Sequence, residues 1–510
     1  MQKISTYNFF YKSLVLILVV AFCLISGLLF SVGVNFSQIN TSLILDLLIK
    51  YWDGDFGFRM LGVLTSALSS ILGITISVSL IIVSLTANRY TPKILNIFIK
   101  SKFSTFVILF NLGSILYTVW LQATLRNVPG IHVPQSSIYL AVAFFSISVF
   151  LLIIYFYRLF YIFNPLNVIE IIKLEITKSL KLSVTKKTKG TRRSLVDSIE
   201  QISDISKQAL KNYETTLTLE AVKKLGDITC MYLEGKSNFH QNWFFIDEEM
   251  FPEHSLQRIA TINQRHYWLE SKMFMQFQMI FTLSVNHMKE SANAVAIQIR
   301  RIGEKALKVN DQNMVKYSIR QLNTLLKIGV QAKDQYSVYN LLYQYTLFAQ
   351  QLLVNDAKYI KKISKYYLYY GLMAQKIGMY FVLKTVFYDL SILLRQLYKD
   401  NPKIGEKVLD ELLQADKMVS KVAEEFLIVD LKKTLVFIAL GLHQESEKKS
   451  YNLLINYLKS QDKAIMQKVV REMNKKVAKE FWEITDRGNN FNYVAKEDRE
   501  DLNLILEKIV

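Results

Sequence analysis

Four long apolar runs in the first third of the chain constrain its fold more than any other feature. They cover residues 14–34, 60–87, 103–123 and 136–160, and the only charged side chain within them is Arg158, near the end of the fourth. At 1.5 Å per residue, each run is long enough to cross a hydrocarbon core of about 30 Å as a helix. The sequence therefore predicts an integral membrane protein whose residues 1–163 form four transmembrane helices.

The distribution of basic residues predicts the orientation of these helices. Lys and Arg gather before the first run, between the second and third and after the fourth, whereas the two opposite loops contain only Lys50, Arg59 and Arg126. Short cytoplasmic segments carry the excess of basic residues in membrane proteins. We therefore expect both termini to be cytoplasmic.

The second apolar run has one face of small residues. Projected at 100° per residue, this face holds Gly62, Ser66, Ser69, Ser70, Gly73, Ser77 and Ser84, interrupted by Leu80. Small residues let helices approach closely in lipid, which favours helix packing. Alternatively the hydroxyl groups line a pore, in which Leu80 forms an apolar constriction.

The sequence lacks the motifs of common enzymes and carriers. No Asp, Glu, Lys or His lies within the apolar runs, which argues against an ion-coupled transporter. The six histidines show no paired metal-binding spacing, and the glycine-rich loops that hold phosphates are absent. We expect no catalytic residue, no metal and no cofactor, and hence a protein that is not an enzyme.

The stretch from Ser84 to Lys102, followed by Asn111–Tyr117 in the third run, resembles a family of bacterial predicted membrane proteins catalogued only as a domain of unknown function. Its most specific part is the small-residue helix followed by Thr91-Pro92-Lys93 and the segment around Phe98. The resemblance covers about residues 10–165. It implies a multi-pass protein of the bacterial inner membrane with four N-terminal transmembrane helices.

A basic segment, residues 164–194, follows the fourth run and carries a net charge of +6. Basic residues beside a membrane attract anionic headgroups, so we expect this segment to be a juxtamembrane helix and linker that contacts membrane lipids. The headgroup candidates lie in the part that we expect to be flexible, and they are Lys186, Lys187, Lys189, Arg192 and Arg193. Residues 195–510 also have a net charge of only +6, so we expect no nucleic-acid partner.

Residues 195–510 predict a large cytoplasmic all-helical domain. Apolar residues recur there at spacings of three and four, and only two prolines occur. The sequence leaves two folds open for this region, a divergent α-solenoid and an irregular helical bundle. The expected helices cover residues 194–212, 215–234, 253–288, 290–308, 311–332, 335–354, 357–377, 379–399, 403–415, 417–442, 447–459, 462–485 and 497–510.

Residues 240–253 form an aromatic and acidic stretch without helical periodicity. Aromatic runs mostly pack into the core, so we favour a core-anchored loop over a ligand or partner site.

Two functions fit this all-α architecture. The first is a membrane-anchored scaffold or regulator whose cytoplasmic domain binds a protein partner. The second is a channel or pore, formed by a homo-oligomer, lined by the second transmembrane helix and gated by the cytoplasmic domain. The stacked repeats of a solenoid form an extended surface that can bind a protein partner. This favours the scaffold.

Overall fold

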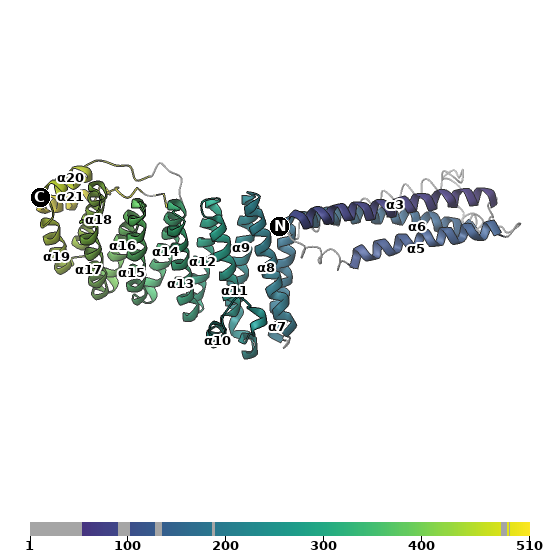
Figure 1. Cartoon of the computed structure of the whole chain (residues 1–510), viewed down its shortest axis with the longest axis horizontal. Coiled ribbons are helices and arrows are strands. Elements are labelled where there is room, and N and C mark those ends of the chain that lie inside the picture. The colour runs from purple at the N-terminus through teal and green to yellow at the C-terminus, as the bar shows by residue number, and fades with distance from the viewer. Residues whose placement is uncertain are drawn as a thin grey trace, which may run out of the picture. The chain divides into compact units, whose positions relative to one another are not determined.

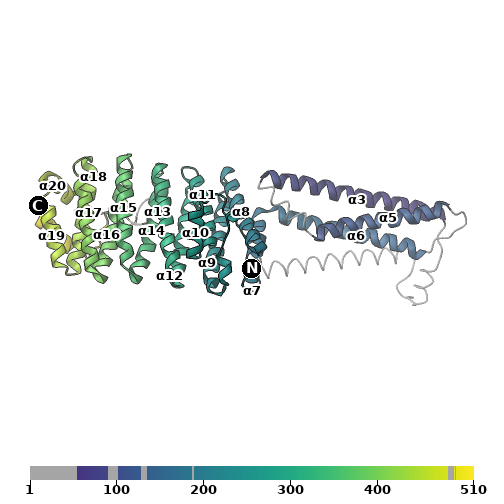
Figure 2. The same ribbon diagram turned by 60° about the horizontal axis from the view of Figure 1, so that its bottom comes forward.

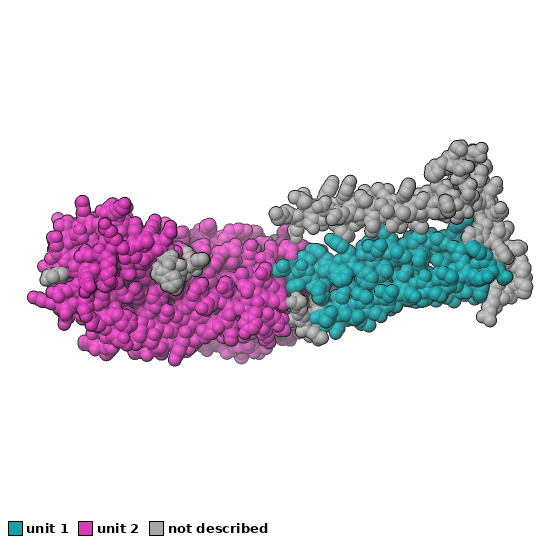
Figure 3. Space-filling view, turned by 90° about the horizontal axis from the view of Figure 1, so that it is seen from above, with its two compact units in different colours: residues 1–167 teal, residues 168–510 magenta. Residues whose placement is uncertain are grey.

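The computed structural model describes residues 54–89, 102–127, 135–185, 189–480, 487–488 and 490–509. The chain divides into two compact units, residues 1–167 and 168–510 (Figure 3). The first predicted membrane span, residues 14–34, lies outside the described residues.

Among its described residues, the first unit has three long apolar helices: α3 (Gly54–Arg89), α5 (Lys102–Asn127) and α6 (Gln135–Phe163). Each packs against the other two. Within them, the segments Asp55–Leu85, Phe103–Thr124 and Ser137–Tyr161 are long and apolar enough to span a membrane. They match the second, third and fourth predicted spans.

The core of this unit is apolar with a few polar contacts. Leu61 and Leu64 of α3 pack against Ala141 of α6 near one end of the helices. Nearer the other end, Ser79 of α3 shares a hydrogen bond of 2.6 Å with the Tyr155 hydroxyl of α6. Because lipid offers no hydrogen-bonding partner, such a bond fixes how two helices meet.

The second unit is a succession of helices that stand side by side in chain order (Figures 1 and 2). They are α7 (Pro165–Thr185), α8 (Lys189–Lys211), α9 (Thr215–Gly235), α10 (Leu256–Arg265), α11 (Trp268–Ser284), α12 (Lys289–Lys308), α13 (Gln312–Gln331), α14 (Gln335–Asn355), α15 (Lys358–Lys376), α16 (Tyr380–Asp400), α17 (Pro402–Val419), α18 (Glu425–Gln444), α19 (Lys448–Lys459), α20 (Lys463–Met473) and α21 (Arg499–Ile509).

These helices form two layers. One layer runs through α8, α11, α13, α15 and α17, and the other through α9, α12, α14, α16, α18 and α20, each helix packing on the next. Neighbours in sequence, such as α13 and α14, also pack together as hairpins. This is the arrangement of an α-solenoid, so the solenoid prediction is confirmed over the irregular bundle.

One turn geometry recurs between the helices. A residue with positive φ ends a helix, and the N–H of the next residue donates to the carbonyl oxygen five positions earlier, as in a Schellman motif. That next residue is also the N-cap of the following helix, which makes a very short connection. The positive-φ residues in these turns are Tyr213, His266, Asn310, Lys333, Gly378 and Ser446.

Some expected boundaries differ from the structure. The predicted helix 253–288 is two helices, α10 and α11, because His266 adopts a left-handed conformation (φ +55°) between them. In the predicted helix 462–485, α20 ends at Met473 and residues 474–480 are not helical, while residues 481–485 lie outside the described residues. Helix α8 begins at Lys189, inside the segment expected to be a flexible linker. The second compact unit begins at Val168, within α7, whose apolar side is buried.

Candidate functional site

A non-helical segment near the C-terminus is bound by side chains of three solenoid helices. We call residues 487–498, of which residue 489 is not described, the strap. The strap precedes α21, which packs on α18 and α19. Near the start of the strap, the N–H of Asn490 donates to the carbonyl oxygen of Lys479 (3.1 Å). This bond joins the strap to the residues that follow α20.

Arg487 is the most deeply buried residue of the strap, with 5% of its surface exposed. Its two terminal nitrogens donate to the two carboxylate oxygens of Asp389 on α16, at 2.6 and 3.1 Å. This bidentate geometry matches the planar guanidinium group. The guanidinium also lies over the rings of Tyr339 and Tyr343 of α14, 4.7 and 5.3 Å from their centroids.

In the buried pair, Asp389 and Arg487 each affect the pKa of the other. Burial raises the pKa of Asp389, and the charge of Arg487 acts in the opposite direction. Burial also opposes the charge on Arg487, but Asp389 outweighs it and raises the arginine pKa. The guanidinium therefore stays charged, and removing either partner would leave an uncompensated polar group in the core.

Phe491 is the second anchor of the strap. Its ring stacks on Tyr388 of α16 with centroids 4.0 Å apart, and lies parallel to Phe381 at 5.9 Å. Offset stacking of this kind adds about 0.5–1.5 kcal/mol to the burial of a ring. Two side chains four residues apart, one cationic and one aromatic, thus bind neighbouring sites on α14 and α16.

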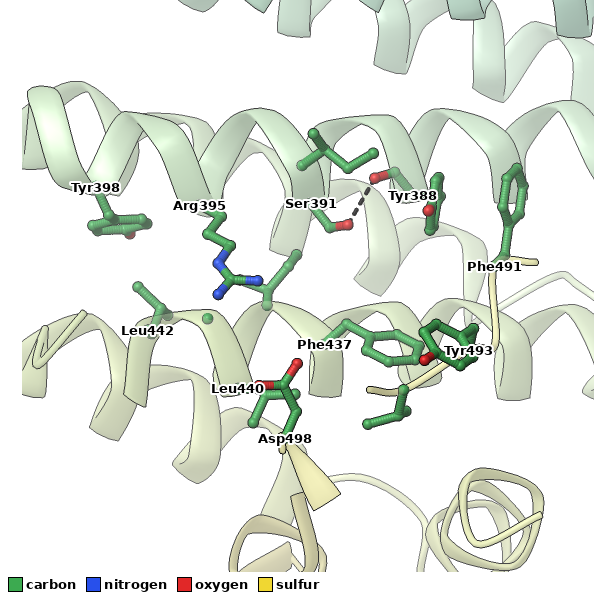
Figure 4. A pocket seen from close by; sticks show the side chains of 14 residues that line it. Tyr388, Ser391, Arg395, Tyr398, Phe437, Leu440, Leu442, Phe491, Tyr493 and Asp498 are labelled. Carbon is green, nitrogen blue, oxygen red and sulfur yellow. Dashed lines mark hydrogen bonds between the residues drawn. The ribbon is translucent and has the colours of Figure 1, made fainter. Parts of the chain in front are cut away.

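A cavity of about 180 Å³ lies next to these anchors, between α16, α18 and the strap (Figure 4). The strap contributes Phe491, which lies beside Tyr388 of α16, and Tyr493 and Asp498, which lie on the side of the cavity opposite Arg395. Gln444 bridges the two sides, since it accepts from Arg395 (2.8 Å) and donates to Asp498 (2.7 Å). The strap thus forms one wall of a small, mixed polar and aromatic site.

The small-residue face of the second span lies on α3, but most of it does not contact α5 or α6. Ser66, Ser69, Ser70, Gly73, Ser77 and Ser84 are exposed, and so is Leu80, with 63% of its surface accessible. Gly62 is half-buried, and an added Cβ there would lie 3.2 Å from Gln122 Nε2 of α5. The helix instead packs through Leu61, Leu64, Leu68, Thr75 and Ser79.

The basic residues expected at lipid headgroups differ in their surroundings. Lys186 and Lys187 lie outside the described residues, and Lys189 is the first residue of α8. Arg193 is exposed. Arg192 donates to the backbone carbonyls of Asn242, at 3.2 Å, and Phe245, so it also holds the loop that follows α9.

The aromatic stretch 240–253 is anchored in the core, as favoured from the sequence. Trp243 and Phe251 are buried, and the Trp243 indole donates to the Tyr232 hydroxyl (3.1 Å). Trp243 also packs on Trp268.

Sequence reasoning missed the residues of the strap site. A signal existed for Asp389, which lies on the apolar side of an amphipathic helix between Phe387 and Leu390. An acid in that position needs a buried partner. The pattern around Arg487, 98 positions away, gives no indication that it is this partner.

Comparisons with known proteins agree with the first part of the sequence. The model of a family described as "Predicted membrane protein (DUF2254)" matches residues 8–221, which confirms the resemblance found there. Among solved structures, the chain is similar to one titled "Circular tandem repeat protein with novel repeat topology and enhanced subunit contact surfaces", with 12% identity, a TM-score of 0.38, and coverage of 82% of this chain and 98% of that one. No curated protein matches the sequence.

Proposed function

We propose that this membrane protein, whose residues 8–221 match a predicted-membrane-protein family, is a non-enzymatic scaffold or regulator. In this proposal, the solenoid lies in the cytoplasm and binds an irregular or extended segment of a protein partner. The membrane is the bacterial inner membrane, with both termini cytoplasmic and anionic lipids near the basic helices.

One observation carries the proposal: the solenoid already holds a non-helical segment, the strap, through two side-chain anchors. Arg487 enters a site formed by Asp389 and the rings of α14, and Phe491 stacks on Tyr388. Stacked helix pairs provide extended surfaces for such binding. Buried arginine and aromatic side chains are also the usual energetic centres of protein interfaces.

The two anchors define the chemistry of the partner. A partner segment that replaces the strap carries an arginine and an aromatic residue four positions apart. Lysine fits this site less well, because a bidentate contact with both oxygens of Asp389 needs the planar guanidinium fork. The strap would therefore act as an intramolecular competitor of the partner.

A peptide with the sequence of residues 485–498, labelled with a fluorophore, tests this proposal. The full chain is reconstituted as wild type and as the double variant Arg487→Ala/Phe491→Ala, which keeps α21 while weakening the strap. We expect fluorescence anisotropy to show at least about tenfold tighter peptide binding to the double variant, because the competing anchors are gone.

Adding Asp389→Asn to the double variant serves as the specificity control. It should abolish the gain, whereas Lys449→Ala, which removes an exposed ion pair with Glu406, should leave it unchanged. Equal peptide binding to wild type and double variant, with both folded by circular dichroism, would contradict the proposal.

A second proposal is a homo-oligomeric pore lined by α3. The observation that favours it is the exposure of the small-residue face, where a Cβ added at Gly73 meets no atom within 4 Å. If copies of the chain assemble through or around this face, Leu80 would form an apolar constriction. Replacing Leu80 with serine would then hydrate it and raise single-channel conductance in a lipid bilayer.

The wild type recorded beside Leu80→Ser decides this second proposal. No current from either protein, with folded chain verified in the same vesicles, would remove the pore from consideration.

A further inference from the structure

A second pocket lies between α10, α11 and α13, away from the strap site. Its volume is about 580 Å³, within the usual range for a small-molecule site. The residues of α10 and its N-cap in the lining include Ser255, Arg258 and Thr261. Helix α11 contributes Tyr267, Ser271 and Gln278, and α13 contributes Tyr317, Arg320, Gln321 and Thr324.

The lining has cationic and hydrogen-bonding groups but no carboxylate. Helices α10 and α13 also carry no acidic residue, while they hold Arg258, Arg265, Lys316, Arg320 and Lys327. Within the part of the chain that the structure describes, neither Arg258 nor Arg320 has an ion-pair partner. Two arginines that lack an ion-pair partner, in a lining without a carboxylate, produce a local positive potential.

The wall between the arginines is rigid. The Tyr267 and Tyr317 rings stack 4.7 Å apart, and the Tyr317 hydroxyl shares a hydrogen bond of 3.1 Å with Ser271 Oγ. Burial raises the pKa of Tyr267, while the positive charges of Arg265, Arg320 and Arg258 act in the opposite direction. All three arginines are therefore near this hydroxyl.

We propose that this pocket binds the phosphate group of a small anionic ligand, with Arg258 and Arg320 contacting the phosphate oxygens. Arginine matches phosphate through paired N–H donors. A soluble phosphorylated compound and a lipid headgroup share this chemistry, and the experiment separates them.

The test is titration of inorganic pyrophosphate into the full chain in phosphatidylcholine nanodiscs, followed by calorimetry. We expect saturable binding at one site per chain. Arg258→Gln and Arg320→Gln should each weaken it at least about tenfold, since each loses a charged hydrogen bond. Lys327→Gln is the matched control, because it removes one exposed charge from the same helix α13 outside the lining.

The outcomes are distinct. No saturable binding, or equal weakening by Lys327→Gln and Arg320→Gln, would overturn the proposal, because the second result indicates diffuse charge attraction. If binding holds, repeating the titration in nanodiscs that contain phosphatidic acid identifies the source. Weaker pyrophosphate binding there assigns the pocket to a lipid headgroup, and unchanged binding assigns it to a soluble phosphate compound.

Discussion

Arg487 and Asp389 lie 98 positions apart in the chain and form a bidentate ion pair that is almost completely buried. The pair joins the strap to the central helices of the solenoid. Its surroundings, three aromatic rings around one guanidinium group, make it the most specific contact of the strap.

Breaking this pair should destabilise the C-terminal helices. Arg487→Ala leaves the Asp389 carboxylate buried without a charge partner, and we expect a loss of about 3–5 kcal/mol in the free energy of unfolding. Lys449→Ala, at an exposed ion pair, should cost less than about 1 kcal/mol. Urea unfolding followed by circular dichroism compares the two variants, and equal midpoints would show that the strap adds little.

Gly303 on α12 should not tolerate even one added methyl group. Its Cβ would lie 2.5 Å from Phe348 Cζ of α14. We expect Gly303→Ala to cost about 1–3 kcal/mol through overpacking, whereas Gly235→Ala, where nothing lies within 4 Å, should cost little. Phe348→Leu combined with Gly303→Ala should recover part of the loss, and a purely additive double mutant would argue against this contact.

Asp334 should make stability depend on acid pH. Burial opposes its charge, but hydrogen bonds from the backbone N–H groups of Ser337 and Asn286 and from the Ser337 hydroxyl prevail and lower its pKa below 3.8. The carboxylate therefore stabilises the fold above pH 3.8, and this contribution is lost as the pH falls through the folded-state pKa.

We thus expect the urea midpoints of wild type and Asp334→Asn to differ most at neutral pH and to approach each other as the pH falls from 3.8 through the lowered pKa of Asp334. The asparagine keeps one acceptor oxygen and cannot titrate in this range. A constant difference from pH 7 to pH 3 would contradict the assignment.

The small-residue face of α3 should affect assembly more than the fold of a single chain. A Cβ added at Gly73 meets nothing within 4 Å, and the residue is exposed. For Gly73→Leu we therefore expect native helix content but an altered distribution of oligomers, measured by light scattering in detergent. Ala141→Leu, at a fully buried site in α6, should instead disrupt the three-helix packing. Unchanged oligomer size in Gly73→Leu would argue against assembly through this face.

Cysteine labelling should determine the orientation in the membrane. In a background with Cys23→Ser, Asp55→Cys should react with an impermeant maleimide in intact cells, and Gly190→Cys should not. The native Cys230 will interfere little, because burial raises its pKa to about 11 and leaves little thiolate at pH 8. Labelling of Gly190→Cys in intact cells would reverse the proposed topology.

The sequence predicted the local structure of the solenoid well and its long-range contacts poorly. Helices such as α14 and α16 were found within one residue at each end, because apolar periodicity and polar turns are local properties. The strap site depends on contact between Asp389 of α16 and Arg487, which are separated in the described chain by four helices, α17 to α20. No local sequence pattern encodes that contact. The sequence also did not identify Thr75 and Ser79 of α3, which are buried in the structure.

The strap also affects how the solenoid unfolds. Stacked helix pairs interact mainly with their nearest neighbours, so a solenoid without other ties frays from its free end one repeat at a time. The strap fastens α21 and its neighbours back to α14 and α16, which closes this end into a loop. The segment from α14 to α21 should therefore open as one cooperative block, and hydrogen exchange along it should be uniform rather than graded toward the C-terminus.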